Sequence, residues 1–261
     1  MAAAHAATAR EVTARLSDAP LEELPALIER YQDDPRKQVR HAVEVAGHRL
    51  SREKAERERV EGMYQLQLDL GGPGMVLGVD EVGRGAIAGP LTVCAVALPQ
   101  EPKVWGINDS KQLTPARREV LAARILDVAQ AVGIYHVEPA SIDAVGMATA
   151  LRMAMAGAIE DADVDPDAVL IDGNPVQVHP KEHTLVKGDS RVASIAAASI
   201  VAKVTRDHIM VGYDALYPEY HLAQCKGYGS ADHIAAIKAH GLSPIHRVSF
   251  CGNFLETPPL F

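Results

Sequence analysis

The sequence predicts an α/β protein, in which a mixed sheet is covered by helices and preceded by a helical N-terminal extension. From residue 75 onward, short apolar runs typical of strands alternate with longer helical patterns. The first two strand-like runs follow one another before the alternation begins, which favours a mixed sheet over a wholly parallel one. The sequence Gly71-Gly72-Pro73-Gly74 breaks the preceding helical pattern and marks a domain boundary. We therefore expect a helical domain over 1–70 and a second domain over 71–261.

Composition excludes several classes of protein. Hydrophobic residues make up 48% of the 261-residue chain and charged residues 23%, which excludes a disordered chain, a collagen and a coiled-coil rod. The longest apolar run is too short for a membrane span, and the N-terminus has no secretory signal pattern. Three widely spaced cysteines indicate a reducing compartment, so we expect a cytoplasmic protein. The net charge of −8 argues against a uniformly basic surface but allows a local basic groove.

Residues 1–70 have a helical pattern. The sequence Asp33-Asp34-Pro35 is typical of a helix start, with the proline in the first turn. From there to about Leu68 no further proline occurs, and one stripe of apolar residues follows: Val39, Ala42, Val43, Ala46 and Leu50. The charged residues of this helix either form a solvated face or make an accessory nucleic-acid contact through Arg36, Lys37, Arg40 and Arg49.

The second region has a predicted order of strands and helices. Strands are expected over 75–82, 91–98, 131–138, 168–173 and 183–189. Helices are expected over 115–129, 141–160 and 190–210, with Thr114 and Ser141 as capping residues of the first two. Residues 256–261 are expected to form a loose tail.

Two adjacent acids, Asp80 and Glu81, lie at the end of the first apolar strand. A buried carboxylate without a partner is costly, so such a strand end needs a reason to contain two. Neighbouring side chains of a regular strand point to opposite faces. Both acids can therefore serve one site only if the strand ends or bulges at Glu81, where the nearby Gly83 would permit a bulge. The alternative is an exposed strand end with solvated acids.

Three further acids are candidates for the same site. Asp172 ends another apolar strand, and Asp189 precedes the Ala-rich helix, where Asp189 or Ser190 could equally be its N-terminal cap. Asp207 lies deeper in that helix, where a surface ion pair or a packing role is favoured. Clustered carboxylates repel one another and are stabilised by a hard divalent cation, Mg²⁺ or Mn²⁺. Two such ions would support phosphodiester cleavage.

The turn Gly83-Arg84-Gly85 follows the acids directly. Glycine permits close approach of a ligand to the backbone, and the arginine side chain suits a phosphate group. Together with Gly89 these residues loosely match a dinucleotide-binding fingerprint. That motif requires a helix next, whereas Pro90 and a strand-like run follow here.

Several segments together resemble bacterial ribonuclease HII over about residues 75–250. They are, in order, residues 79–85, 108–111, 170–174, 186–191, 197–207 and 226–229. The resemblance implies a ribonuclease H-like fold, with a central mixed five-stranded sheet flanked by helices. It also implies an endonuclease that cleaves the RNA strand of RNA–DNA hybrids and incises duplex DNA 5′ of single embedded ribonucleotides. Its products would carry 5′-phosphate and 3′-hydroxyl ends.

The resemblance also implies roles for individual residues. The catalytic carboxylates, which would hold Mn²⁺ or Mg²⁺, would be Asp80, Glu81, Asp172 and Asp189. Substrate would be bound by Gly83, Arg84, Gly85, Tyr228, Asn108 and Lys111. Backbone groups of residues 83–85 would contact the 2′-hydroxyl of the ribonucleotide, and Tyr228 would stack on the deoxyribose on its 3′ side. The N-terminal region would assist substrate binding.

Other expectations concern partners and rival classes. The partners implied are RNA–DNA hybrid and ribonucleotide-containing duplex DNA, with no membrane, and the protein is expected to be a monomer. A noncatalytic nucleic-acid-binding protein is the main alternative, and it would bind hybrids in a salt-sensitive way without cleaving them. A dinucleotide-dependent oxidoreductase is a more distant one.

Overall fold

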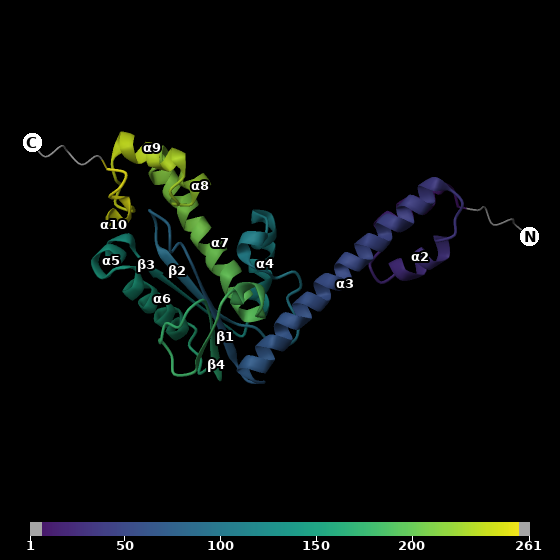
Figure 1. The fold of residues 1–261 in the computed structure, drawn as a ribbon, viewed down its shortest axis with the longest axis horizontal. Helices are drawn as coiled ribbons and strands as arrows, with labels where there is room; N and C mark the ends of the chain where they lie inside the picture. The colour runs from purple at the N-terminus through teal and green to yellow at the C-terminus, as the bar shows by residue number, and fades with distance from the viewer. Residues whose placement is uncertain (1–6, 256–261) are drawn as a thin grey trace, which may run out of the picture. The chain divides into compact units, whose positions relative to one another are not determined.

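The computed structural model of the chain describes residues 7–255, and the tail expected at 256–261 lies outside them. The chain forms two compact units, Met1–Glu61 and Gly62–Phe261, which divide within the long helix α3 (Lys37–Gly71). Figure 1 shows the order of the elements along the chain.

The first unit is a small helical bundle. Helix α1 (Ala9–Asp18) begins with a capping box, in which the Thr8 and Glu11 side chains each accept the other's backbone amide. Helices α1 and α2 (Leu24–Tyr31) bury apolar residues against the first part of α3, including the stripe expected from the sequence. Helix α3 begins at Lys37, two residues later than expected, because Asp34 Oδ1 accepts the Arg36 amide and holds a turn before the helix.

The second unit contains a mixed five-stranded sheet in the order β3-β2-β1-β4-β5. Strand β1 pairs antiparallel with β2 and parallel with β4, while β2 and β3 are antiparallel and β4 and β5 parallel. The α/β fold and five-stranded sheet predicted from the sequence are therefore confirmed. The strands are β1 (Val76–Val82), β2 (Leu91–Ala97), β3 (Ala131–Val137), β4 (Ala168–Asp172) and β5 (Glu182–Leu185).

Helices cover both faces of this sheet (Figure 1). Helix α7 (Ala193–Leu216) packs so closely on β1 that a Cβ atom at Gly78 would lie 2.1 Å from the backbone of Ser194. On the other face, a Cβ at Gly133 of β3 would lie 2.1 Å from the Ala158 carbonyl of α6. The helices of this unit after α3 are α4 (Pro115–Val128), α5 (Pro139–Val145), α6 (Met147–Asp161), α7 (Ala193–Leu216), α8 (Leu222–Cys225), α9 (Ala231–His240) and α10 (Val248–Cys251).

Two of the differences between predicted and observed elements are each explained by one residue. The helix expected over 141–160 is two helices, since Gly146 has a φ of +79° and interrupts the helical hydrogen bonds; α5 begins at Pro139, so Ser141 is not its cap. The strand expected over 183–189 ends at Leu185, because Lys187 adopts a left-handed conformation with a φ of +57°.

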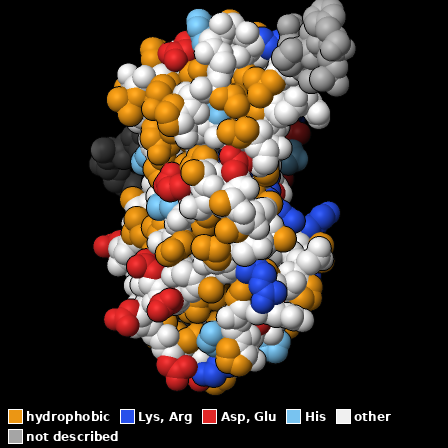
Figure 2. Space-filling view, turned by 90° about the vertical axis from the view of Figure 1, so that its left-hand side faces the viewer, with side chains coloured by type: hydrophobic (Ala, Val, Ile, Leu, Met, Phe, Trp, Pro, Cys, Tyr) orange, Lys and Arg blue, Asp and Glu red, His pale blue; other side chains and the backbone are white. Residues whose placement is uncertain are grey.

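The surface carries no uniform basic coat on the face drawn in Figure 2, where acidic side chains gather along the left margin. This distribution agrees with the net charge of −8. Within residues 7–255, none of the helices combines the length and the apolar character needed to cross a membrane.

Candidate active site

The ends of two neighbouring parallel strands bring three of the predicted acids together. Strands β1 and β4 are parallel, and Val79 lies opposite Ile171. The next residue of each strand, Asp80 and Asp172, therefore lies at the same edge of the sheet. Glu81 is the next residue of β1. The charge of Asp172 raises the pKa of both Asp80 and Glu81, and that of Glu81 also raises the pKa of Asp80, in each case in addition to burial.

Strand β1 continues in regular register through Glu81 to Val82, so the strand end or bulge that a site shared by both acids would require at Glu81 is absent. Asp80 pairs with Cys94 and Glu81 with Val93 in an uninterrupted antiparallel register. The two acids therefore occupy opposite faces: the Asp80 carboxyl forms a hydrogen bond with Ser199 of α7, whereas Glu81 lines a pocket beside α6. Asp172 interacts with both because it lies at the very end of the adjacent strand.

Burial and mutual repulsion perturb these carboxyl groups. Burial, followed by the charges of Glu81 and Asp172, holds the pKa of Asp80 well above its usual range. Burial and Asp172 likewise raise the pKa of Glu81, although Arg84 and Lys111 oppose the shift. Such a set is stabilised when positive charge is brought to it.

Asp189 joins the same cluster and is not a helix cap. It lies buried in a short 3₁₀ turn, Gly188–Ser190, while the N-terminal cap of α7 is Val192, whose side chain makes no capping bond. The capping role considered for Asp189 and Ser190 is therefore wrong. Burial, with the nearby charges of Asp109 and Asp172, raises the pKa of Asp189 to about 6.

Lys111 is a cation set among these acids. Its pKa is raised although burial opposes the change, because Asp109, Asp80, Asp189 and Asp172 all favour the charged ammonium. Asn108 instead makes local contacts: its Oδ1 accepts the Asp109 amide, and its Nδ2 donates to Gln112 Oε1 at 3.2 Å. Sequence reasoning missed Asp109, and its position between Asn108 and Lys111 was the available signal.

The turn of residues 83–85 uses its glycines in different ways. Gly83 has a φ of +84°, and a Cβ there would lie 2.2 Å from Arg206 Nε, so its missing side chain makes room for the protein itself. A Cβ at Gly85 would meet nothing within 4 Å, which leaves its backbone open to a ligand. Arg84 is 62% exposed, with Nη1 3.7 Å from Glu81 Oε1. The strand β2 follows instead of a helix, so a dinucleotide-binding motif is wrong.

Tyr228 lies partly exposed, beside the same turn. The residue is 38% exposed, and its ring faces two cations: the Arg206 guanidinium carbon lies 5.5 Å and Lys203 Nζ 5.9 Å from the ring centre. The preceding carbonyl, of Gly227, accepts the backbone amides of Ile87 and Ala88. The segment of Tyr228 is thus tied to the loop that follows residues 83–85.

Other charged candidates have structural contacts. Asp207 forms an ion pair with Lys203 at 2.7 Å and lies 3.9 Å from Arg118, in agreement with the ion-pair role favoured from the sequence. Arg36 binds Asp34 through two nitrogens, and Arg49 donates to the Ser17 carbonyl. Lys37 and Arg40 are exposed.

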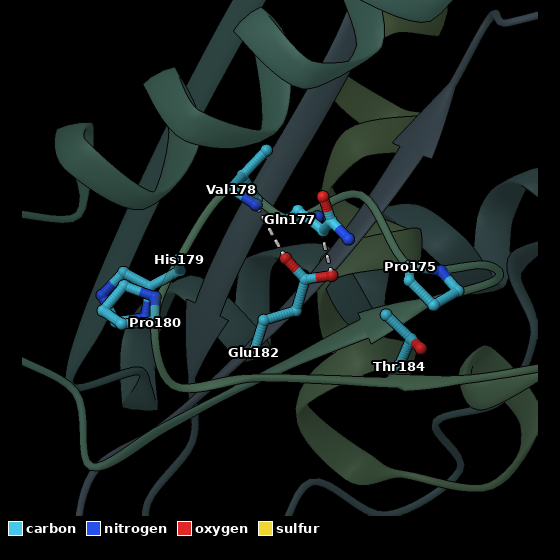
Figure 3. Close-up of a pocket in the computed structure, with 7 residues that line it drawn as sticks. All are labelled: Pro175, Gln177, Val178, His179, Pro180, Glu182 and Thr184. Atoms are coloured by element: carbon cyan, nitrogen blue, oxygen red, sulfur yellow. Dashed lines mark hydrogen bonds between the residues drawn. The ribbon is translucent and has the colours of Figure 1, made fainter.

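Two surface cavities lie near the end of β4. One, of about 330 Å³, borders the acids and is lined by residues that include Glu81, Arg84, Arg152 and Asp172. The other (Figure 3) contains none of the predicted site residues. There Glu182 accepts backbone amides from residues 176–178 and orders the β4–β5 loop; these bonds lower its pKa although burial opposes them.

The donor set of this site fits a hard divalent cation. All four predicted ligands, Asp80, Glu81, Asp172 and Asp189, are carboxylates, and oxygen donors of this kind suit Mg²⁺ or Mn²⁺. Over residues 7–255, three or more such side chains do not converge to coordination distance. Burial first, and then the charges of neighbouring acids, raise the pKa values of Asp80, Glu81 and Asp189, so a bound cation would relieve both effects.

Comparison with known proteins identifies the family. The family model for ribonuclease HII matches residues 77–253, and the model for the ribonuclease HII N-terminal domain matches residues 8–70. Ribonuclease HII of Lachnoclostridium phytofermentans is 43% identical over 86% of this chain and 89% of its own length. That of Geobacillus thermodenitrificans is 40% identical over 93% and 94%. The ribonuclease H2 structure from Pyrococcus horikoshii superposes with a TM-score of 0.59 and 26% identity, covering 69% of this chain and 96% of that one. With its catalytic fold and its helical N-terminal region both matched, this chain belongs to the ribonuclease HII family of metal-dependent endonucleases that act on RNA–DNA hybrids.

Proposed function

We propose that this endonuclease also incises duplex DNA 5′ of a single embedded ribonucleotide, leaving 5′-phosphate and 3′-hydroxyl ends. The observation that carries the proposal is the meeting of Asp80, Glu81 and Asp172 at one sheet edge, followed directly by the open backbone of Gly85. A cluster of acids supplies the cleavage chemistry, and an accessible backbone beside it supplies a place to recognise a 2′-hydroxyl.

In this proposal, four carboxylates hold Mg²⁺ or Mn²⁺: Asp80, Glu81, Asp172 and Asp189. When bound, the ions would supply an activated water for attack on phosphorus and support for the departing 3′-oxygen. Asp80 and Glu81 lie on opposite faces of β1, and the charge of Asp172 at the end of the adjacent strand acts on both of them.

The remaining residues position the substrate. Backbone groups of residues 83–85 contact the 2′-hydroxyl, and the exposed guanidinium of Arg84 binds a neighbouring phosphate. Tyr228 stacks on the sugar 3′ of the ribonucleotide through its exposed ring. Lys111 and, in a lesser role, Asn108 contact the substrate strand.

Residues 1–70 form an accessory substrate-binding domain in this proposal, and 71–261 the catalytic domain. Lys37 and Arg40 are suited to phosphate contact because both are exposed, whereas Arg36 and Arg49 already have partners within the first unit. We further propose that the protein acts as a monomer.

A gel assay tests the activity. Three labelled duplexes are compared in Mg²⁺, in Mn²⁺ and with a chelator: a full RNA–DNA hybrid, a DNA duplex with one ribonucleotide, and pure DNA. We expect cation-dependent cleavage of the first two and none of the third. Salt-sensitive binding without product in any cation would instead support a noncatalytic binding protein.

A further inference from the structure

Two buried arginines lie beneath the proposed substrate-reading surface. Its two reading elements are the turn of residues 83–85 and Tyr228. Arg206 of α7 and Arg247, which precedes α10, are both 0% exposed. Within residues 7–255, neither forms an ion pair with a carboxylate; their N–H groups donate to backbone carbonyls instead. Burying a guanidinium is costly, and an apolar residue of similar volume would often fill such a space more cheaply. Their positions therefore call for a reason beyond packing.

Arg206 joins the two segments that the proposal assigns to the ribonucleotide. Its Nε donates to the Pro90 carbonyl at 2.9 Å, and its Nη2 to the Ala88 carbonyl at 3.0 Å. Its Nη1 donates to the Lys226 carbonyl at 2.8 Å, two residues before Tyr228. One planar group thus spans the loop after residues 83–85 and the segment of Tyr228.

The same guanidinium also contacts both reading elements directly. It occupies the space where a Cβ of Gly83 would lie, and it faces the ring of Tyr228 from 5.5 Å. A shift of Arg206 would therefore change the turn and the tyrosine ring together.

Arg247 holds the other end of the loop. Its Nη1 donates to the Arg84 carbonyl at 3.1 Å, inside the turn itself, while Nε and Nη2 both donate to the Gly89 carbonyl at 3.0 and 2.8 Å. Its backbone amide donates to the Ile87 carbonyl at 2.8 Å. Four N–H groups of this one residue therefore donate to backbone carbonyls within residues 84–89.

We propose that Arg206 and Arg247 are positioning residues that fix the turn of residues 83–85 relative to Tyr228, and so determine selectivity for a single ribonucleotide. This inference rests on the proposed function. A single ribonucleotide offers one 2′-hydroxyl, which must meet the turn while Tyr228 meets the adjoining deoxyribose. A full hybrid offers a 2′-hydroxyl at every nucleotide, so a displaced turn still finds one.

Arg206→Lys and Arg247→Lys test the inference, because lysine keeps the charge but loses the planar fork of donors. For each folded variant, kcat/KM is measured on the single-ribonucleotide duplex and on the full hybrid. Leu121→Ala serves as the control for lost stability, because Leu121 is buried in α4, an element separate from the turn of residues 83–85 and the segment of Tyr228. Melting curves place all assays below the unfolding transition.

We expect the arginine variants to lose about tenfold more kcat/KM on the single-ribonucleotide duplex than on the hybrid, the scale of one charged hydrogen bond. Leu121→Ala should reduce kcat/KM on both substrates by the same factor. Equal losses on both substrates in the arginine variants would overturn the inference while leaving the proposed function intact. Wild-type protein that cleaves the hybrid but ignores the single ribonucleotide would end both proposals. If Arg206→Lys fails to fold, Arg247→Lys decides by the same criterion.

Discussion

The backbone amide of Gly188 donates a hydrogen bond of 2.6 Å to Oδ1 of Asp172. This bond links the end of β4 to the turn that contains Asp189, so two acids 17 residues apart are held at one place. Gly188 has little room for a side chain, since a Cβ would lie 2.6 Å from Ile195 Cδ1. The fourth carboxylate is thus positioned by a loop, whereas the other three are positioned by the sheet.

Asp80→Asn should abolish cleavage without loss of stability. Removal of a group that acts as part of a catalytic unit costs about 10⁴-fold in rate. The buried Asp80 carboxyl is disfavoured in its charged form, so the neutral amide should keep the melting temperature equal or raise it. Hybrid cleavage and thermal unfolding are measured side by side.

Asp207→Asn is the matched control, because this acid lies outside the proposed cluster. It should retain most of the cleavage activity but melt earlier, since it leaves the half-buried Lys203 without its ion-pair partner. Ordinary turnover by Asp80→Asn, or inactivity of folded Asp207→Asn, would contradict the assignment.

Gly83→Ala and Gly85→Ala should have opposite consequences. Alanine at 83 would be strained at a φ of +84° and would meet Arg206, so its unfolding free energy should fall by about 1–3 kcal/mol. Alanine at 85 has open space, so this variant should fold normally. Its methyl group, however, would prevent the ribose from approaching the backbone closely. A displacement of that kind costs about 10²-fold in kcat/KM. Urea unfolding and cleavage of the single-ribonucleotide duplex distinguish the two, and normal cleavage by Gly85→Ala would exclude close approach there.

Tyr228→Ala should impair cleavage at the RNA–DNA junction far more than it impairs stability. The ring is partly exposed, and the cation–π contacts that it loses with Lys203 and Arg206 are worth about 1 kcal/mol each. Tyr228→Phe keeps the ring and should keep most of the activity if stacking is its role. Melting temperatures and single-ribonucleotide cleavage rates are compared, and equal loss of activity in both variants would assign the role to the hydroxyl instead.

Mg²⁺ or Mn²⁺ should raise the melting temperature of the protein. A cation that binds only the folded state stabilises it by about 2.7 kcal/mol at a hundred times its Kd. The shift should shrink in Asp172→Asn, which removes one of the proposed ligands, and NaCl of equal ionic strength controls for general screening. An equal shift in Asp172→Asn and wild type would argue against this residue as a ligand.

The position of Asp80 and Asp172 at one edge of the sheet could be predicted, because each acid follows an apolar run and this pattern is visible within a few residues. The contacts beneath the reading surface could not be predicted. Arg206 is adjacent to Asp207 in the sequence and resembles a surface residue of an ordinary helix, yet two of its three carbonyl partners lie 116 and 118 residues away in one loop. The break at Gly146 was also missed, because a lone glycine in a helical pattern is usually tolerated.

A buried histidine pair predicts how stability depends on pH. His233 Nε2 lies 3.0 Å from His246 Nε2; the other His233 nitrogen faces the Tyr228 carbonyl, and that of His246 accepts the Ser243 amide. These contacts suit two neutral rings, and burial together with His233 lowers the pKa of His246 to about 4. The pKa of His233 is lowered as well, chiefly by burial.

The unfolded chain therefore binds protons more readily than the folded protein at these two sites, so stability is complete above about pH 6.5 and falls as the pH drops toward 4. His246→Gln can preserve an acceptor and a donor but has no proton to gain. We expect urea unfolding of wild type to show a steeper loss between pH 6.5 and 4.5 than the variant shows. Parallel pH profiles for the two proteins would mean that other groups cause the acid sensitivity.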